Sequence, residues 1–229
     1  MDILNFISWI KGGRVVTKVD PAKTLLPVGL KDNKRDDGYL AGAISVADLT
    51  TQLTPEPTYK VFTALLTQNG GDNFIDIFSG NLTIGVTYRI FDDGAGLPNW
   101  DFTNVGAPNN DLFTYFIATG TTPNSWGTGI GLQYNTGAPT AIVLENTIGN
   151  IWFTYTGVGV YQINNSNDLF ISNKYFILLG SSNDGVLNGA ISSAVIYNNT
   201  QGEIQTSNID GIARDNQLYN TTLEIRVYN

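Results

Sequence analysis

Short segments with strand-like residue patterns recur from residue 59 to the end of the chain, and they constrain the fold more than any other feature. Each is rich in β-branched and aromatic residues, and nearly every interval between them contains Gly, Asn or Asp. This spacing is typical of sandwiches and barrels and not of βαβ units. We therefore predict an all-β fold with an antiparallel β-sandwich or jelly-roll-like body. The candidate strands are residues 59–68, 81–91, 112–119, 140–145, 150–156, 159–163, 174–180, 190–198, 202–207 and 221–229.

Residues 1–53 differ from this body and predict an N-terminal arm with little core of its own. A short helix is expected over residues 3–10, which are mostly apolar and are followed by two glycines. A membrane span would need about 20 apolar residues, so no membrane insertion is expected. Residues 24–30 are expected to be extended. A second short helix is predicted over residues 44–53, with Ser45 as its N-cap.

The arm and the body are separated by residues 54–58, TPEPT, whose two prolines predict a stiff, extended linker. The charge changes at the same place. Residues 1–53 hold seven basic and six acidic residues, whereas the remainder holds five basic and fourteen acidic residues. Because exposed apolar residues usually mark interfaces, we expect the arm to dock onto an assembly partner through its apolar run. The alternative is that this run folds back onto the body. The run comprises Ile3, Leu4, Phe6, Ile7, Trp9 and Ile10.

The composition excludes several kinds of chemistry. The chain has no cysteine and no histidine, so disulfides, thiolate or imidazole zinc sites, cysteine nucleophiles and triads with a histidine base are absent. A net charge of −8 disfavours binding to nucleic acid, whose phosphates repel an acidic protein. Carboxylates alone can cleave glycosidic bonds, but only as a suitably spaced pair, and no sequence rule identifies one here. We expect no enzymatic activity and no cofactor.

A metal site is not expected either. Residues 92–96, DDGAG, offer carboxylates to calcium but lack the ligand spacing of a calcium-binding loop, so we predict a plain turn there.

Several stretches resemble predicted virion proteins of tailed bacteriophages, particularly the crAss-like phages: FTNVGAPNN, FIATGTTPNSW, LQYNTGAPT and VLENTIGNIWFTYTGVGVY. The arm resembles a leader that often precedes such modules. The resemblance implies a structural component of a virion, a head, collar or tail fibre or spike subunit, assembled in the host bacterial cytoplasm. It also implies partners among the capsid, portal, collar or tail proteins. Self-association is expected, with a trimer favoured. The alternative is a monomeric capsid decoration protein held by its arm.

The resemblance also implies an inserted module. In related chains a strand like YKVFTALLTQ runs almost directly into a segment like VLENT, whereas here a long stretch separates the two. Residues 74–136 are therefore expected to form an inserted small β module. The outer β domain would then be discontinuous, residues 59–73 plus 137–229. Turn-rich sequences at both junctions agree with an insertion, since insertions are tolerated at loop tips.

The alternative function is a carbohydrate-binding receptor module for host adsorption. Sugar rings pack their C–H faces on aromatic side chains, and their hydroxyls need polar partners. Candidate residues in or beside loops are Trp100, Asp101, Trp126 and Tyr134. A place in the core is the competing interpretation for both tryptophans, and Trp152, in a strand with Thr154, is expected to be a core residue. A host surface glycan would be the partner.

Overall fold

The chain separates into two compact units, Met1–Pro57 and Thr58–Asn229, and each is described by itself. The computed structural model describes the backbone of residues 25–31, 39–45, 59–181 and 191–228. Side chains are described for the same residues except 25–31, 39–45 and 93–98.

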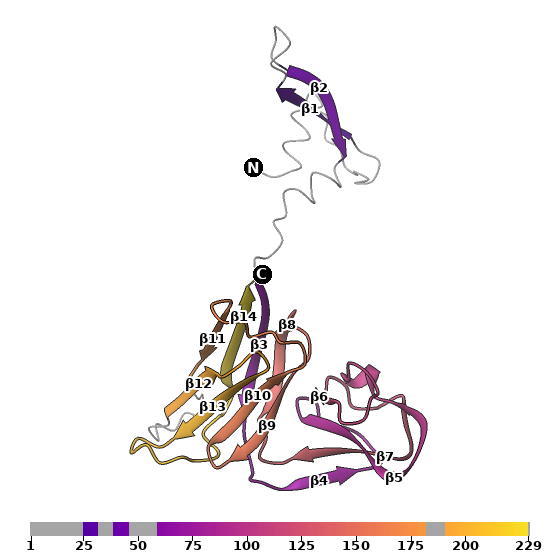
Figure 1. The fold of residues 1–229 in the computed structure, drawn as a ribbon, viewed down its shortest axis with the longest axis vertical. Helices are drawn as coiled ribbons and strands as arrows, with labels where there is room; N and C mark the ends of the chain where they lie inside the picture. Colours follow the sequence, from indigo (N-terminus) through magenta and orange to yellow (C-terminus); the bar gives the residue numbers. More distant parts are fainter. Residues whose placement is uncertain (1–24, 32–38, 46–58, 182–190, 229) are drawn as a thin grey trace. The chain divides into compact units, whose positions relative to one another are not determined.

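The first unit holds an antiparallel hairpin. β1 spans Leu25–Lys31 and β2 spans Tyr39–Ser45, with Leu25 opposite Ser45 (Figure 1). β1 lies in the segment predicted to be extended. β2 ends at Ser45, the residue predicted to cap the second helix. The two predicted helices otherwise fall at residues 3–10 and 46–53, which lie outside the described residues.

The second unit contains a sandwich of two four-stranded antiparallel sheets. One sheet has the order β11-β14-β3-β8 and the other has the order β12-β13-β10-β9 (Figure 1). This confirms the predicted all-β class and its sandwich body. The described part of the chain contains no α-helix. The strands are β3 (Tyr59–Thr67), β8 (Thr140–Asn146), β9 (Ile151–Gly157), β10 (Val160–Asn165), β11 (Tyr175–Leu179), β12 (Ile191–Ile196), β13 (Gln201–Ser207) and β14 (Thr221–Tyr228).

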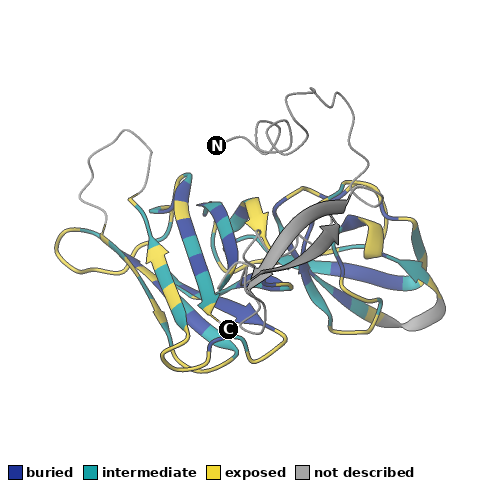
Figure 2. Cartoon of the chain, turned by 90° about the horizontal axis from the view of Figure 1, so that it is seen from above, coloured by how far each residue is buried: buried dark blue, intermediate teal, exposed yellow. Residues whose placement is uncertain are grey.

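Alternating residues build the core between the two sheets. In β14, Leu223 and Ile225 are fully buried, whereas Glu224 between them is half-buried. The same alternation gives bands of colour along the strands in Figure 2. Phe62 of β3 and Phe153 of β9 meet between the sheets, with ring centroids 6.2 Å apart. Each such side chain stabilises the fold by roughly 1.5–3 kcal/mol through burial.

A third sheet is built from the residues between β3 and β8, although β3 and β8 themselves pair directly. Its order is β4-β7-β5-β6, and it has a core of its own that includes Tyr88, Phe102, Phe116 and Leu132. In Figure 1 this sheet lies beside β9. The strands are β4 (Phe74–Ile77), β5 (Thr87–Asp101), β6 (Tyr115–Ile117) and β7 (Ser125–Asn135), with a 3-10 turn over Thr103–Val105.

The turn predicted over residues 92–96 is wrong, because β5 continues through them to Asp101. β5 pairs with β7 on both sides of this segment, with register shifts between Asp92 and Leu97 and between Leu97 and Trp100. Such irregularities let a glycine-containing segment stay in a sheet, since a bulge accommodates extra residues in one strand. The pairing with β7 therefore overrides the local turn preference of DDGAG.

The strands β4 and β7 were not predicted. β7 contains three glycines, which ordinarily mark loops, and Gly127 and Gly129 have positive φ angles of 65° and 73°. Gly131 is required for packing rather than for a turn. A Cβ at this position would lie 2.8 Å from the ring of Phe91 and 2.9 Å from the ring of Phe78. The glycines therefore admit aromatic rings close to the strand.

Candidate binding site

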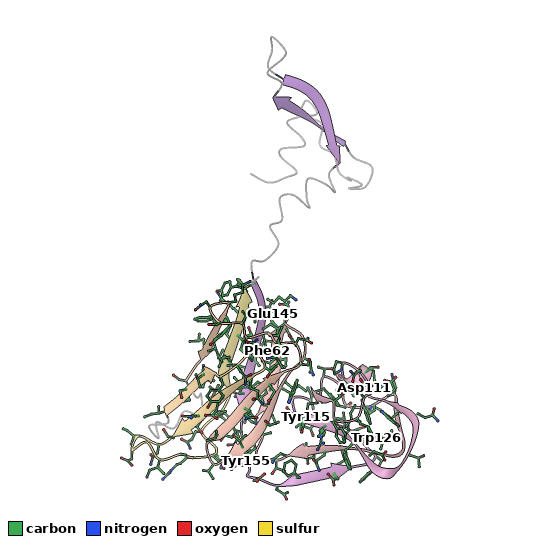
Figure 3. All side chains as sticks on the ribbon, in the orientation of Figure 1. Phe62, Asp111, Tyr115, Trp126, Glu145 and Tyr155 are labelled. Atoms are coloured by element: carbon green, nitrogen blue, oxygen red, sulfur yellow. The ribbon has the colours of Figure 1, made fainter. Side chains whose placement is uncertain are left out.

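A cleft of about 360 Å³ lies between β9 and β10 of the sandwich and the strands of the third sheet. Its walls are rich in aromatic and amide side chains. Tyr115 of β6 and Tyr155 of β9, both labelled in Figure 3, line it from the two sides. This size falls at the lower end of the range for small-molecule sites.

The sandwich wall is formed by the outward face of β9 and β10. Trp152 lies opposite Asn164, and Thr154 lies opposite Gln162. The amide nitrogen of Asn164 donates to the Thr154 hydroxyl at 3.1 Å. Phe153 points the other way, into the core, because successive residues of a strand face opposite sides. Period-two alternation therefore places a tryptophan, a threonine and two amides on one wall.

A ring stack joins the two walls. Tyr115 and Trp152 are parallel, with centroids 5.7 Å apart and planes 6° apart. The side-chain amide of Asn150 donates to the backbone oxygen of Tyr115 at 2.8 Å, and the Phe153 N–H donates to the Thr87 hydroxyl at 3.3 Å. These contacts hold β9, an edge strand of the sandwich, against the third sheet. The cleft is therefore lined by a stacked aromatic pair where β9 meets the third sheet.

Arg89 of β5 lines the same cleft and is the only charged residue among the described ones that do so. Its guanidinium carbon lies 4.6 Å from the centroid of the Phe113 ring and 5.8 Å from that of Tyr115. The Nε of Arg89 is buried and has no hydrogen-bond partner within the described part of the chain. The arginine is therefore held by aromatic faces and not by a carboxylate.

Two amide side chains of the β7 wall are hydrogen-bonded to carboxylates. Gln133 donates to Asp76 at 2.8 Å and Asn135 donates to Asp72 at 2.7 Å, in both cases through the side-chain amide nitrogen. Tyr134, between these two amides, also lines the cleft. Each aspartate fixes the amide that it binds, so this wall is polar and ordered.

Asp215 binds the cleft residue Tyr155 and its buried neighbour Tyr161. The Tyr155 hydroxyl donates to it at 2.9 Å, and the buried Tyr161 hydroxyl donates at 3.0 Å. Burial and then the Asp215 carboxylate raise the pKa of Tyr155 to about 12. Burial chiefly raises the pKa of Tyr161 as well. Both phenols are therefore neutral donors at physiological pH, and their role is structural.

Of the predicted ligand residues, Trp100 and Trp126 lie in strands, one residue from the strand end, and pack at the edge of the third sheet's core. They face each other across β5 and β7. The Trp100 indole donates to the Asn110 backbone oxygen at 2.8 Å, and the Trp126 indole donates to the Gly80 backbone oxygen at 3.2 Å. Both indole N–H groups are used internally, and neither side chain lines the cleft.

Asp101 is also engaged internally. Its carboxylate accepts from the Thr103 hydroxyl at 2.6 Å and backbone N–H at 2.9 Å, and from the side-chain amides of Asn124 at 2.9 Å and Asn110 at 3.3 Å. These hydrogen bonds, led by that from Thr103, hold its pKa well below the usual range. Asp101 therefore organises the loops around it. Tyr134 is the only predicted ligand residue that lies in the cleft.

The core position expected for Trp152 holds only in part. Trp152 is half-buried and packs against the sandwich core, but it also lines the cleft, and its strand neighbours Ile151 and Phe153 are the fully buried residues. Sequence reasoning missed Arg89 and Tyr115 altogether. Alternation in residues 150–156 was a usable signal for Trp152, because it sets this residue and Thr154 opposite two apolar neighbours. No comparable local signal marks Tyr115.

The predicted docking residues of the arm, from Ile3 to Ile10, lie outside the described residues. Within the described ranges, no group of three acidic residues is placed to hold a metal ion. Nor do those ranges contain a helix with the length and apolar character needed to cross a membrane. No family model, curated protein or solved structure matches the chain.

Proposed function

We propose that this chain is a structural component of a bacteriophage virion, a head, collar or tail fibre or spike subunit. Residues 1–53 attach it to the particle, and the β body projects outward. The observation that carries this proposal is the division of the chain after Pro57, within the predicted linker. A body with its own packed cores does not need the arm for folding, so the arm is free to serve attachment.

The surface of the body supports the same role. Several of its loops are closed by uncharged side chains, as at Asn198, whose side-chain oxygen accepts from the backbone of Thr200 at 2.8 Å and of Gln201 at 2.9 Å. Asn208 closes the loop after β13 in the same way, accepting from the Ile212 N–H at 2.9 Å. Such Asx turns stabilise loops without disulfides, which suits a cysteine-free protein outside the cell.

The attachment role is tested with phage particles that carry variants of the chain. Ile7→Asp and Trp9→Asp should remove the protein from purified particles, because a charge in an apolar interface is costly. Ile209→Asp is the matched control, since Ile209 lies on the body and is 73% exposed. Mass spectrometry of the particles measures incorporation. Normal incorporation of both arm variants would refute attachment through this run.

A second function, glycan binding during host adsorption, is favoured by the cleft. The stacked pair of Tyr115 and Trp152 offers aromatic surface for the C–H face of a sugar, and the amides of Gln162 and Asn164 offer partners for its hydroxyls. Rigid aromatic rings bind at a low cost in conformational entropy. We propose the cleft, in place of the loops near Trp100, as the sugar site.

The glycan role is separable from attachment. Trp152→Ala should leave the protein on particles and reduce adsorption to host cells, because the stack loses its larger ring. Tyr219→Ala is the control, since Tyr219 is an exposed aromatic residue that does not line the cleft. Adsorption is counted as the fraction of particles bound to cells. Unchanged adsorption by Trp152→Ala particles, with the variant present on them, would contradict a sugar site in the cleft.

A further inference from the structure

Arg89, a cation in the cleft, has no carboxylate counter-ion among the described residues, and this feature points to the class of sugar. Resting on the proposed glycan-binding role, we propose that the cleft selects glycans that carry a carboxylate, such as those containing hexuronic acid, and that Arg89 pairs with this carboxylate. A neutral sugar would use the stack and the amides but would leave the arginine unpaired.

The charge distribution around the cleft supports this selection. The chain is acidic overall, yet no Asp or Glu lines the cleft among the described residues, whereas Arg89 does. On the β7 side, the carboxylates of Asp72 and Asp76 are bound to the amides of Asn135 and Gln133. A ligand anion in the cleft therefore finds Arg89 in the lining, whereas the carboxylates of Asp72, Asp76 and Asp215 already accept hydrogen bonds from Asn135, Gln133 and Tyr155. Repulsion from more distant carboxylates is screened at physiological salt, where the Debye length is about 8 Å.

A comparison with Arg226 shows that an arginine over aromatic rings can also pair with a carboxylate in this protein. Arg226 also lies over aromatic rings, with its guanidinium carbon 4.8 Å from the centroid of Tyr59 and 5.9 Å from that of Phe176. It is nevertheless paired with the carboxylate of Glu224. Arg89 has the same aromatic setting without a carboxylate partner among the described residues. Its charge is therefore available to a ligand.

The arginine is also prearranged for a planar anion. The guanidinium carbon lies near the rings of Phe113 and Tyr115, and its Nε is buried. The proposed pairing therefore uses the terminal nitrogens. Guanidinium groups bind carboxylates through charge-assisted hydrogen bonds. A single cation matches a singly charged carboxylate better than a phosphate dianion.

The test uses the full chain on an array of hexuronate oligosaccharides, each paired with its carboxyl-reduced, neutral counterpart. The best pair is then titrated by calorimetry. The acidic member should bind roughly tenfold to a hundredfold more tightly, as expected for hydrogen bonds to a charged group. Arg89→Gln should abolish this preference while neutral binding persists. Arg226→Gln, which removes the same charge outside the cleft, should retain the preference.

The outcomes separate this inference from the glycan role itself. Binding to neutral and acidic members with equal affinity would overturn selection by Arg89 and leave glycan binding intact. Binding nowhere on the array would overturn both. Loss of all binding in Arg89→Gln is checked with Arg89→Lys, which keeps the charge and should keep part of the preference. If Arg89→Lys shows the wild-type fold by circular dichroism and no preference remains, the charge is not what selects the ligand.

Discussion

Removal of the Asp215 carboxylate should destabilise the sandwich, because this side chain accepts hydrogen bonds from three donors on β9, β10 and the turn between them. The donors are the hydroxyls of Tyr155 and Tyr161, at 2.9 and 3.0 Å, and the backbone N–H of Gly159, at 2.8 Å. Asp215 lies between β13 and β14, so these bonds tie that connection to the strands that form the cleft wall.

The magnitude follows from what each donor loses in Asp215→Ala. A hydrogen bond to a charged group contributes roughly 1.5–3 kcal/mol. The buried Tyr161 hydroxyl retains Gln68 as an acceptor at 3.0 Å, and the half-buried Tyr155 can turn its hydroxyl towards water. The Gly159 N–H loses its Asp215 acceptor outright. Because the three bonds share one acceptor, their contributions are not additive, and we expect a loss of about 2–4 kcal/mol.

Equilibrium unfolding in urea, followed by tryptophan fluorescence, measures this loss. Asp210→Ala is the control, because Asp210 is an exposed acidic residue in the same connection, and its side chain accepts only a long hydrogen bond of 3.3 Å from Asn208. Its free energy of unfolding should change by less than about 0.5 kcal/mol. If Asp215→Ala is as stable as the Asp210→Ala control, the network does not hold the connection and the reasoning is wrong.

Three further predictions concern pH, glycine and self-association. Because the pKa of Tyr155 is raised from 10.0 to about 12, the stabilising contribution of Tyr155 is fully present below pH 10 and is lost between pH 10 and 12. The midpoint of thermal unfolding should fall across this range, and a midpoint independent of pH would contradict the prediction. Gly159→Ala should lower the free energy of unfolding by more than about 2 kcal/mol, because the new Cβ would lie 2.4 Å from the Thr206 backbone oxygen. Gly211→Ala, where φ is also positive but the space is open, should lower it by about 1–2 kcal/mol. Equal losses in urea unfolding would refute the steric argument. If the arm associates, light scattering should show that the full chain is an oligomer and that a chain beginning at Thr58 is a monomer. Monomers in both cases would count against association through the arm. The same trimer in both cases would place association in the body.

The sandwich strands could be predicted because their residues alternate clearly. In β14, polar and apolar residues alternate from Thr222 to Val227, and one sheet face is buried, so the pattern matches the pleat. The residues that close the turns, mostly Gly and Asn, were equally visible. Positive φ angles at Asn173, Asn216 and Asn220 show why asparagine marks these positions. Residue patterns along the chain were therefore sufficient to predict these strands and the turns between them.

The third sheet was harder to predict because its strands depend on each other. β7 is glycine-rich, and β5 contains DDGAG, so each in isolation resembles a loop. They become strands by pairing with each other and by placing aromatic rings over glycine. This pairing joins residues 24–44 positions apart in the sequence, from the pair Asp101 and Ser125 to the pair Arg89 and Gln133. No window of local sequence contains that information.

The candidate site shows the same limit. Trp100 and Trp126 were prominent in the sequence as large aromatic residues near loops, but their indole N–H groups bond to backbone oxygens of other segments. Arg89, Tyr115 and Trp152 come from three strands of two sheets, and only the close packing of β6 on β9 brings them together. A sequence records residue types, whereas a cleft depends on distances between strands.

The sequence by itself determined the all-β class, the alternation of the sandwich strands and the exclusion of thiol and imidazole chemistry, because these depend on composition and on neighbours along the chain. The tertiary structure alone decided which strands pair, which aromatic rings enter a core and which line a cleft. It also decided that Asp101 is bound by its own loops and that Arg89 has no carboxylate partner among the described residues. The physical reason is that burial, ring stacking and charge pairing are set by contacts between residues far apart in the chain.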